Sequence, residues 1–431
     1  MAMTKEEKGW IWYDIANSVY SLIIITTIMP VFFKTYASAG IPDATSTANW
    51  GIANSVASLI IAVLAPALGA MADRPGRKKR FFAFFLFLGI ISTLMLTLIG
   101  QGQWLIALII FTVSVVGYSG ANIFYDSFLI DVTTHEKMDW ISSAGYALGY
   151  ISSVLPMVVI LLMFQFGGKE NSLTVTKLAF VITAVWWAAL SIPMLKNVKQ
   201  KYHSEAAEHS IIGSFLQLFQ TLREIRKHRS AMIFLGAYFL YIDGIGTIVK
   251  MAVPYGQDLG LTPTSLVLVV LGIQIVACPC ALLYGRLAEK YTARKLIVMG
   301  IIIYTFITFI GSMIPLLQSR DHRLILFWAL AMLIATSQGG VQSLSRSFFG
   351  KLIPRENSAE FFGFYNVFGK FATVAGPLLM AIMIELTGQS CFGFLSIGFL
   401  FIGGLWLFLK IKPENLTSSC KNTASPACDC K

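Results

Sequence analysis

Twelve long apolar runs constrain this chain more than any other feature of its sequence. A transmembrane helix needs about 20 mostly apolar residues, and a membrane β-strand only about 10. Backbone polar groups in lipid must be paired within the segment, which favours helices for runs of this length. The approximate ranges are 11–36, 49–71, 81–100, 104–130, 141–166, 177–195, 231–254, 265–285, 296–317, 323–346, 361–386 and 391–409. The sequence therefore predicts an all-α integral membrane protein with twelve transmembrane helices.

The connections between these runs are short, with one exception halfway along the chain. Residues 196–230 form a polar, charged segment that separates six runs from the next six. We therefore expect an N-terminal six-helix half over residues 1–195 and a C-terminal half over 231–409. Residues 196–230 are then a cytoplasmic linker, and 410–431 form a cytoplasmic tail.

The charge distribution fixes the expected orientation in the membrane. Only 13% of the residues are charged, against about a quarter in a typical soluble domain. The net charge of +11 is compatible with a nucleic-acid-binding surface. However, 26 of the 33 Lys and Arg residues fall in the termini and in every second loop. This is the pattern of the positive-inside rule, so we expect both termini in the cytoplasm and no nucleic-acid partner.

A short motif follows the second apolar run and recurs 216 residues later, after the eighth. Such an internal repeat is typical of transporters built from two related halves. The first copy contains Gly69, Asp73, Arg74, Gly76, Arg77, Lys78 and Lys79, and the second contains Gly285, Glu289, Lys290, Arg294 and Lys295, with Thr292 where the first has Gly76. The repeat supports the division into six plus six helices.

The first copy of the motif can be interpreted physically. Gly69 permits close helix approach at the membrane edge. Asp73 can pair with an arginine or accept hydrogen bonds from the N-terminus of a neighbouring helix. Pro75-Gly76 makes a sharp turn, and the basic run after it anchors the loop on the inner face.

This motif resembles the signature loop of the major facilitator superfamily. The resemblance implies two six-helix halves around a central cavity, lined chiefly by helices 1, 4, 7 and 10, that opens alternately to either side. It also implies that the loop gates this change without touching the substrate. The gating residues would be Gly69, Asp73, Arg74, Gly76 and Arg77.

A narrower resemblance rests on motifs from the first helix to the eleventh. They include Tyr13-Asp14-x-Ala16-Asn17-Ser18, Gly340-x-Gln342-x-Leu344-Ser345-Arg346-Ser347 and Phe361-Phe362-Gly363-x-Tyr365-Asn366. Together they are similar to the bacterial "unknown major facilitator" group, relatives of fungal autophagy-linked vacuolar amino-acid effluxers. This resemblance implies an amino acid or a similar metabolite as the solute. The fourth helix departs from the group's Asn-type pattern, because it has Asp126 and Asp131 there.

Two charged residues lie near the middle of predicted helices, where a charge costs roughly 2.5–3.5 kcal/mol and usually faces a cavity or a partner. Asp243 lies in the seventh helix and Lys370 in the eleventh, and we expect them at a similar depth. Asp243 is a candidate for titrating a proton or binding a substrate amine. Lys370 would be its counter-ion or a clamp for a carboxylate. Alternatively, the two form a structural ion pair within the C-terminal half.

Three further candidates lie on the first and fourth helices. Asp14 and Asn17 lie near the start of the first helix, and Asp126 lies towards the inner end of the fourth. All three could bind polar groups of a solute, because these helices line the cavity in the superfamily that the chain resembles. Alternatively, Asp14 caps the inner end of its helix.

The tenth helix carries uncharged polar residues and one arginine. Gln338 and Gln342 are candidates for solute contact or for helix packing. Arg346 ends this helix, and it could pair with Asp126 or with acidic loop residues. We expect a gating role for Arg346.

No enzyme signature is found in the sequence. A Walker loop is absent, and the five His residues lack a spacing such as His-Glu-x-x-His. A Gly-x-Ser-x-Gly nucleophile motif is also absent. The six Cys residues do not form a two-pair zinc spacing. We expect no enzymatic activity, no cofactor and no resident metal.

The sequence therefore predicts a secondary active transporter that moves a small polar solute by alternating access, with an amino acid as the first expectation. We expect coupling to protons and a monomer in a bacterial inner, or cytoplasmic, membrane. A metal or other metabolite importer on the same fold is an alternative. A non-transporting membrane receptor or scaffold is an alternative of another class.

Overall fold

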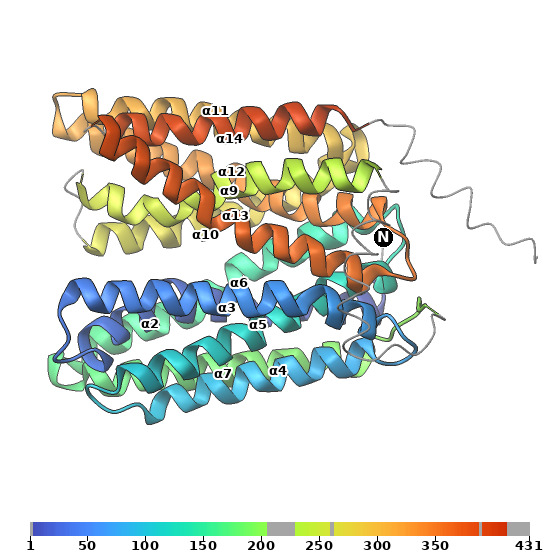
Figure 1. The fold of residues 1–431 in the computed structure, drawn as a ribbon, viewed down its shortest axis with the longest axis horizontal. Helices are drawn as coiled ribbons and strands as arrows, with labels where there is room; N and C mark the ends of the chain where they lie inside the picture. Colours follow the sequence, from blue (N-terminus) through green and yellow to red (C-terminus); the bar gives the residue numbers. More distant parts are fainter. Residues whose placement is uncertain (1–2, 205–228, 259–262, 388–389, 412–431) are drawn as a thin grey trace, which may run out of the picture.

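The computed structural model describes residues 3–204, 229–258, 263–387 and 390–411 (Figure 1). Within these ranges the chain is helical and contains no strand, which confirms the all-α prediction. The first span consists of α1 (Lys5–Tyr20), η1 (Ser21–Thr27), α2 (Ile28–Phe32) and η2 (Phe33–Ala37). The other long helices are α3 (Asp43–Ala72), α4 (Lys78–Met95), α5 (Trp104–Val132), α6 (Met138–Gly167), α7 (Ser172–Asn197), α9 (Arg229–Asp258), α10 (Pro263–Tyr291), α11 (Ala293–Met313), α12 (Arg320–Leu352), α13 (Ser358–Thr387) and α14 (Ser390–Leu409).

These helices are suited to a bilayer. In the described ranges, eleven of them are long and apolar enough to cross a membrane, and α13 contributes a shorter apolar stretch, Ala375–Thr387. Large apolar side chains face outwards, among them Leu98, Phe166 and Leu386, each at least three-quarters exposed. Lipid rather than water is the solvent for such a surface.

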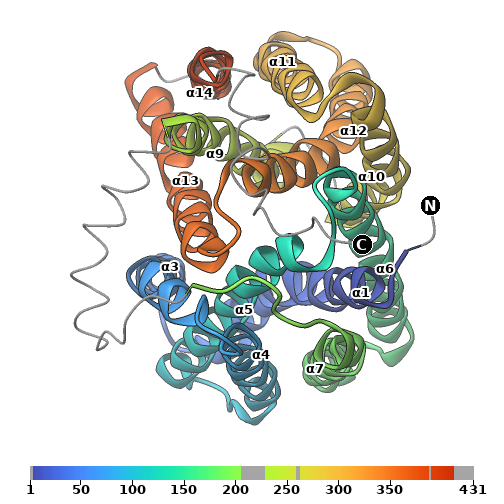
Figure 2. The ribbon, with the colours of Figure 1, turned by 90° about the vertical axis from the view of Figure 1, so that its right-hand side faces the viewer.

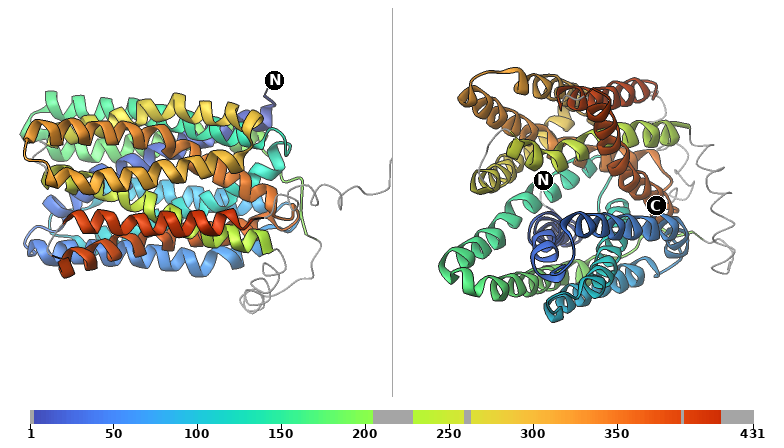
Figure 3. Two further views of the ribbon diagram at one scale, coloured as in Figure 1. Left: turned by 90° about the horizontal axis from the view of Figure 1, so that it is seen from above. Right: turned by 60° about the vertical axis from the view of Figure 1, so that its left-hand side comes forward.

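The helices form two groups that lie side by side (Figures 1 and 2). α1 and α3–α7 lie on one side, and α9–α14 lie on the other. Several pairs of helices join the groups: α3 packs against α13, α6 packs against α10 and α12, and α5 packs against α13. The long helices run roughly along one direction, as the left-hand view of Figure 3 shows.

Glycines, which have no side chain, allow two of the closest helix contacts. A Cβ on Gly69 of α3 would lie only 2.7 Å from Cα of Glu360 at the start of α13. Gly145 and Gly149 of α6 pack directly against Asp14 and Ser18 of α1. These contacts confirm the close approach that small residues at the membrane edge predict.

The first span is not one continuous α-helix. Wide π-type turns over η1 and η2 interrupt it, with Pro30 between them in α2. Pro30 lacks a backbone N–H and cannot continue the normal ladder. The Thr27 hydroxyl donates to the carbonyl oxygen of Leu22 at 2.7 Å, and the Thr26 hydroxyl donates to that of Ser21 at 2.9 Å. These bonds satisfy carbonyls at the break, which the apolar pattern did not predict.

Candidate functional site

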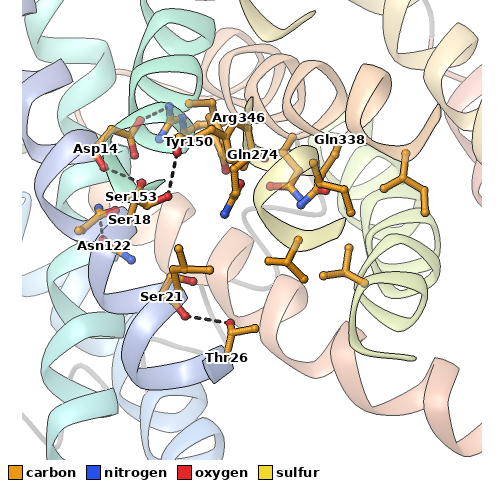
Figure 4. Close-up of a pocket in the computed structure, with 18 of the residues that line it drawn as sticks. Asp14, Ser18, Ser21, Thr26, Asn122, Tyr150, Ser153, Gln274, Gln338 and Arg346 are labelled. Carbon is orange, nitrogen blue, oxygen red and sulfur yellow. Dashed lines mark hydrogen bonds and ion pairs between the residues drawn. The ribbon is translucent and has the colours of Figure 1, made fainter. Parts of the chain in front are cut away.

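A cavity of about 450 Å³ lies between the two groups of helices (Figure 4). Solute sites in proteins are commonly 300–1,000 Å³ in volume. Its walls come from both groups, and α1, α5, α9 and α12 contribute to them, as the superfamily resemblance implies. Six residues singled out in the sequence line this cavity: Asp14, Asn17, Asp126, Gln338, Gln342 and Arg346.

Arg346 forms one end of the cavity and joins the two groups. Its guanidinium donates to Asp14 Oδ2 at 3.0 Å and to Asp126 Oδ1 at 3.2 Å. It also donates to the hydroxyl and the carbonyl oxygen of Ser142, at 3.0 and 3.1 Å. The predicted pairing of Arg346 with Asp126 is therefore present, with Asp14 as a second carboxylate partner.

Aromatic rings surround this charged cluster. The guanidinium carbon of Arg346 lies 4.5 Å from the ring centroids of both Trp10 and Tyr146, and 5.4 Å from that of Tyr125. Cations over aromatic faces are attracted by the ring quadrupole, more strongly where water is excluded. Arg346 is 2% exposed. The cluster is therefore buried at the closed end of the cavity.

Asp14 is not a helix cap. α1 begins at Lys5, and Thr4 with Glu7 forms a reciprocal capping box there. The helix thus starts more than two turns before Asp14, which is why the capping alternative is wrong. The apolar pattern places the start of this helix too late in the sequence, because the first turns of α1 contain polar residues.

The two sides of the cavity differ in polarity. Figure 4 shows Ser18, Ser21 and Asn122 on one side and Gln274 and Gln338 across from them. The N-terminal group supplies a mostly polar wall that includes Asn17, Ser18, Ser21, Thr26, Asn122 and Ser153. The C-terminal group supplies Gln274, Gln338 and Gln342 together with the apolar residues Val249, Ala252, Leu266, Val269, Val270, Ile273, Phe327 and Ile334.

Two amides orient residues of the site. Asn17 donates to the side-chain oxygen of Asn122 at 3.0 Å, and Asn366 of α13 donates to Asp126 Oδ2 at 3.1 Å. Sequence reasoning did not select Asn122, Asn366 or Gln274 as site residues. The available signal was a side-chain amide within an apolar run, which is costly in lipid unless it faces a partner or a cavity.

Asp243 does not line the cavity. Its side chain is fully buried. Its neighbours on α13 and α14 include Gly376, and Phe401 next to Gly244. The carboxylate is not among the residues that line the cavity in this arrangement, and its predicted role in binding a substrate amine stays a prediction. The side chain of Lys370 lies outside the described residues, so its predicted pairing with Asp243 stays a prediction.

The first copy of the repeated motif joins the groups at the end of the molecule that also holds the start of the linker. Asp73 accepts hydrogen bonds from the backbone N–H groups of Ala359 and Glu360, both at 2.9 Å. These amides belong to the first turn of α13, so the expected use of a helix N-terminus is present. Burial raises the pKa of Asp73 to about 7, since Lys78 and the two amides offset only part of the lost hydration.

Lys78 differs from the prediction of a basic run on the inner surface. It is fully buried, and its ammonium group donates to Asp131 at 2.9 Å and to the Ser358 hydroxyl at 2.7 Å. Asp131 also accepts from the backbone N–H groups of Lys201 and Tyr202, at 2.8 and 2.9 Å. The described start of the linker therefore positions Asp131, the partner of Lys78. Sequence alone could not separate Lys78 from its exposed neighbour Arg80.

The other residues of the motif shape its turn. Gly76 has a φ of +67°, and the Arg77 N–H donates to the Arg74 carbonyl oxygen at 3.2 Å. The side chains of Arg74 and Arg77 are half-buried. Thr292, the counterpart of Gly76 in the second copy, also has a φ of +67°. The repeat thus keeps the positive φ after losing the glycine, although the second connection is shorter: α10 ends at Tyr291 and α11 begins at Ala293.

A second set of bonds closes the same end of the cavity. Asp139, in the first turn of α6, accepts from Lys351 Nζ at 2.7 Å and from the Ser347 hydroxyl at 2.6 Å. The Ser142 hydroxyl donates to the Ser343 carbonyl oxygen at 2.7 Å. Together with Arg346 and Asp73, these contacts tie the two groups at one end.

Comparison with known proteins identifies the family. The family described as "Vacuole effluxer Atg22 like" matches residues 43–137 and 130–420. The chain is 43% identical to "Uncharacterized MFS-type transporter YxiO" of Bacillus subtilis, over 96% of both chains. It is 27% identical to "Autophagy-related protein 22" of Yarrowia lipolytica, over 64% of this chain and 50% of that protein.

Solved structures confirm the fold. The proton:xylose symporter XylE superposes with a TM-score of 0.72 at 12% identity, over 96% of this chain and 97% of that chain. The transporter FucP in the outward conformation superposes with a TM-score of 0.68 at 13% identity, over 95% and 98%. Because the sequence match covers most of the chain and the fold agrees, this protein belongs to the Atg22-like vacuole effluxer family of the major facilitator superfamily, and it is a secondary transporter rather than an enzyme.

Proposed function

We propose that this transporter carries a zwitterionic amino acid with an apolar side chain, coupled to protons. The observation that carries this proposal is Arg346, held between Asp14 and Asp126 at the end of a cavity with one polar and one apolar wall. A zwitterion presents both a carboxylate and an ammonium group, and this cluster offers a partner for each.

The charged end of the cavity suits an amino-acid backbone. The planar guanidinium of Arg346 matches a carboxylate in a bidentate geometry. Asp14 and Asp126 are available to an ammonium group once the solute carboxylate displaces one of them from Arg346. The cluster carries two negative charges and one positive charge, so added positive charge is favoured there.

The apolar wall suits the side chain of the solute. Val269, Val270 and Ile273 of α10 line the cavity further from Arg346, with Phe327 and Ile334 of α12. Burying an apolar side chain of leucine size contributes about 1.5–3 kcal/mol. A solute with a charged or strongly polar side chain would lose this contribution.

Transport follows from opening and closing the two groups around this cavity, with the N-terminal half over 1–195 and the C-terminal half over 231–409 as moving bodies. The bonds of Asp73, Lys78, Asp139 and Arg346 close one end in this structure. The positive-inside pattern places this end, with both chain termini, in the cytoplasm of a bacterial cell. The cavity is then set to load from the opposite side. One chain supplies both walls, so a monomer suffices.

A second candidate is a hydroxylated metabolite such as a sugar. Six side-chain amides lie at the cavity, together with several tyrosine hydroxyl groups, and such groups suit solutes with many hydroxyls. The six are Asn17, Asn122, Gln274, Gln338, Gln342 and Asn366.

A ligand-stabilisation screen on purified protein tests the proposal. The panel contains L-leucine, L-phenylalanine, glycine, L-aspartate, D-xylose and Mn²⁺, with leucine methyl ester and the matching α-keto acid as controls that lack one charge. We expect L-leucine and L-phenylalanine to raise the melting temperature and both controls to fail. Proteoliposome uptake of labelled L-leucine with and without a proton gradient then tests transport.

Stabilisation by D-xylose alone would favour the hydroxylated-metabolite reading. Equal stabilisation by leucine and its methyl ester would contradict the role of Arg346 as a carboxylate site.

A further inference from the structure

Asp243 of α9 is a buried carboxyl group that the solute cavity does not explain. Its side chain is fully buried, and neither carboxylate oxygen has a hydrogen-bond partner in the described part of the chain. Buried polar atoms are nearly always hydrogen-bonded, and an ionised carboxylate without a partner is especially unfavourable. A proton or a cation must therefore accompany this group in the present arrangement.

The surroundings of Asp243 favour a proton over a metal cation. The Thr247 hydroxyl donates to the backbone carbonyl oxygen of Asp243 at 2.7 Å. A Cβ on Gly376 of α13 would lie 2.9 Å from Asp243 Oδ1, so the α13 backbone passes directly over the carboxyl group. Hard metal cations take about six oxygen ligands, and the described neighbours offer far fewer. A proton needs the carboxyl group alone.

The charged residues around Asp243 are few. Lys250 lies two turns further along α9, is exposed, and interacts electrostatically with Asp243. α14, which packs against α9, has no charged residue between Ser390 and Leu409. α13 carries Lys370, whose side chain lies outside the described residues, and the exposed Glu385 at its far end. On α12, Arg346 faces the other group of helices.

We propose that Asp243 binds the coupling proton, at a site separate from the solute cavity. This rests on the proposed function only in requiring a solute whose transport the proton drives. α9 and α13 connect the two sites, because Tyr238 and Tyr365 line the cavity and their rings stack at 4.3 Å. Losing the proton would leave a buried negative charge between α9 and α13. Release therefore requires these helices to separate, which links proton release to the change of access.

The proton site can be tested without any solute by infrared difference spectroscopy of purified protein. Asp243→Asn should remove a protonated-carboxyl C=O band that the unmodified protein shows at neutral pH. Glu170→Gln, at an exposed loop acid, should leave this band in place. A difference spectrum without this band would overturn the proposal, whatever the solute is.

Proteoliposomes test the coupling, with L-leucine as the probe and a trapped pH indicator. The unmodified protein should move protons with L-leucine and accumulate it down a proton gradient. Asp243→Asn should reduce both signals more than tenfold, and stabilisation by L-leucine should show that this variant is folded. Asp243→Glu, which keeps the carboxyl group, should recover part of the coupling.

These outcomes separate the two proposals. Gradient-driven accumulation by Asp243→Asn at half the unmodified level or more would overturn the proton site. No L-leucine flux in the unmodified protein would refute the proposed solute, and the infrared band would still decide the proton site.

Discussion

Arg346 joins the solute cavity to the contacts that close it. Its guanidinium reaches Asp14, Asp126 and Ser142 at once and stacks against Trp10 and Tyr146. A lysine at this position would keep the charge but could not make these bonds together, because its ammonium is a point charge on a flexible stem. Under the proposed function, one residue would therefore couple occupancy of the cavity to closure of this end of the molecule.

We predict that Arg346→Lys folds but binds L-leucine at least tenfold more weakly. Arg346→Ala should be more damaging, because breaking a buried ion pair by removing one partner costs about 3–5 kcal/mol. Titration calorimetry and thermal unfolding in detergent measure the two effects. Arg80→Lys, at an exposed position, is the matched control. Unchanged affinity in Arg346→Lys would remove Arg346 from the binding site.

The limits of sequence reasoning are also visible at this scale. Asp14, Asn17 and Asp126 were identifiable because a polar residue in a membrane helix needs a reason to be there. Asp243 met the same criterion but lies behind the cavity wall. Hydropathy gives the depth of a residue along its helix, but the direction in which it faces depends on helix packing.

At the scale of elements, the two copies of the repeated motif show what a turn requires. Gly76 and Thr292 share a φ of +67°, a conformation that costs a residue with a side chain of order 1–3 kcal/mol. Gly76 in the first copy adopts this conformation without strain. In the second copy, the helices on either side constrain Thr292 to it. The sequence marked the second copy as degenerate, yet the positive φ at this position is retained.

We predict that Thr292→Gly stabilises the protein by about 1 kcal/mol, because glycine adopts this backbone conformation without strain. The reciprocal change, Gly76→Thr, should destabilise it by a similar or larger amount. Thermal unfolding of the purified variants in detergent gives both values. A lower melting temperature for Thr292→Gly would show that the threonine side chain makes compensating contacts.

Helix number and order could be predicted from sequence, whereas breaks within helices could not. Apolar runs located the spans to within about six residues at their ends, because each must bury its backbone in lipid. The π-type turns around Pro30 left no mark in that pattern, since the residues remain apolar on both sides of the break. The buried position of Lys78 was missed for a related reason, as its partner Asp131 is distant in sequence.

At the scale of the whole molecule, the two groups of helices are tied at one end. Asp73 of the N-terminal group holds the start of α13, and Lys78 reaches Ser358 across the same interface. The start of the linker supports these contacts from the N-terminal side, because the backbone N–H groups of Lys201 and Tyr202 donate to Asp131. Opening this end requires the bonds to α13 to break, while those of the linker to Asp131 can persist.

We predict that Asp73→Ala shifts the equilibrium towards opening at this end without altering solute preference. Losing charge-assisted bonds to two buried amides should cost about 2 kcal/mol, or roughly a thirtyfold change in the populations. Spin labels at Glu136 and Arg294, in a background without native cysteines, report the separation as a distance distribution. Arg80→Ala, at an exposed position in the first turn of α4, is the control. A changed solute ranking in Asp73→Ala would contradict a purely gating role.

The contrast between the cavity walls has a kinetic consequence. Under the proposed function, a solute that enters from the end opposite Arg346 would meet the apolar side chains of α10 and α12 first and reach Arg346 last. When the solute leaves by the same route, its charged end dissociates from Arg346 first, and its side chain stays in contact with the apolar wall for longer. With about 0.8 kcal/mol for each methylene group, dwell time should lengthen nearly fourfold for every carbon added to the side chain. The residence time of the solute would thus depend on the size of its apolar side chain, and its selection would depend on its charge.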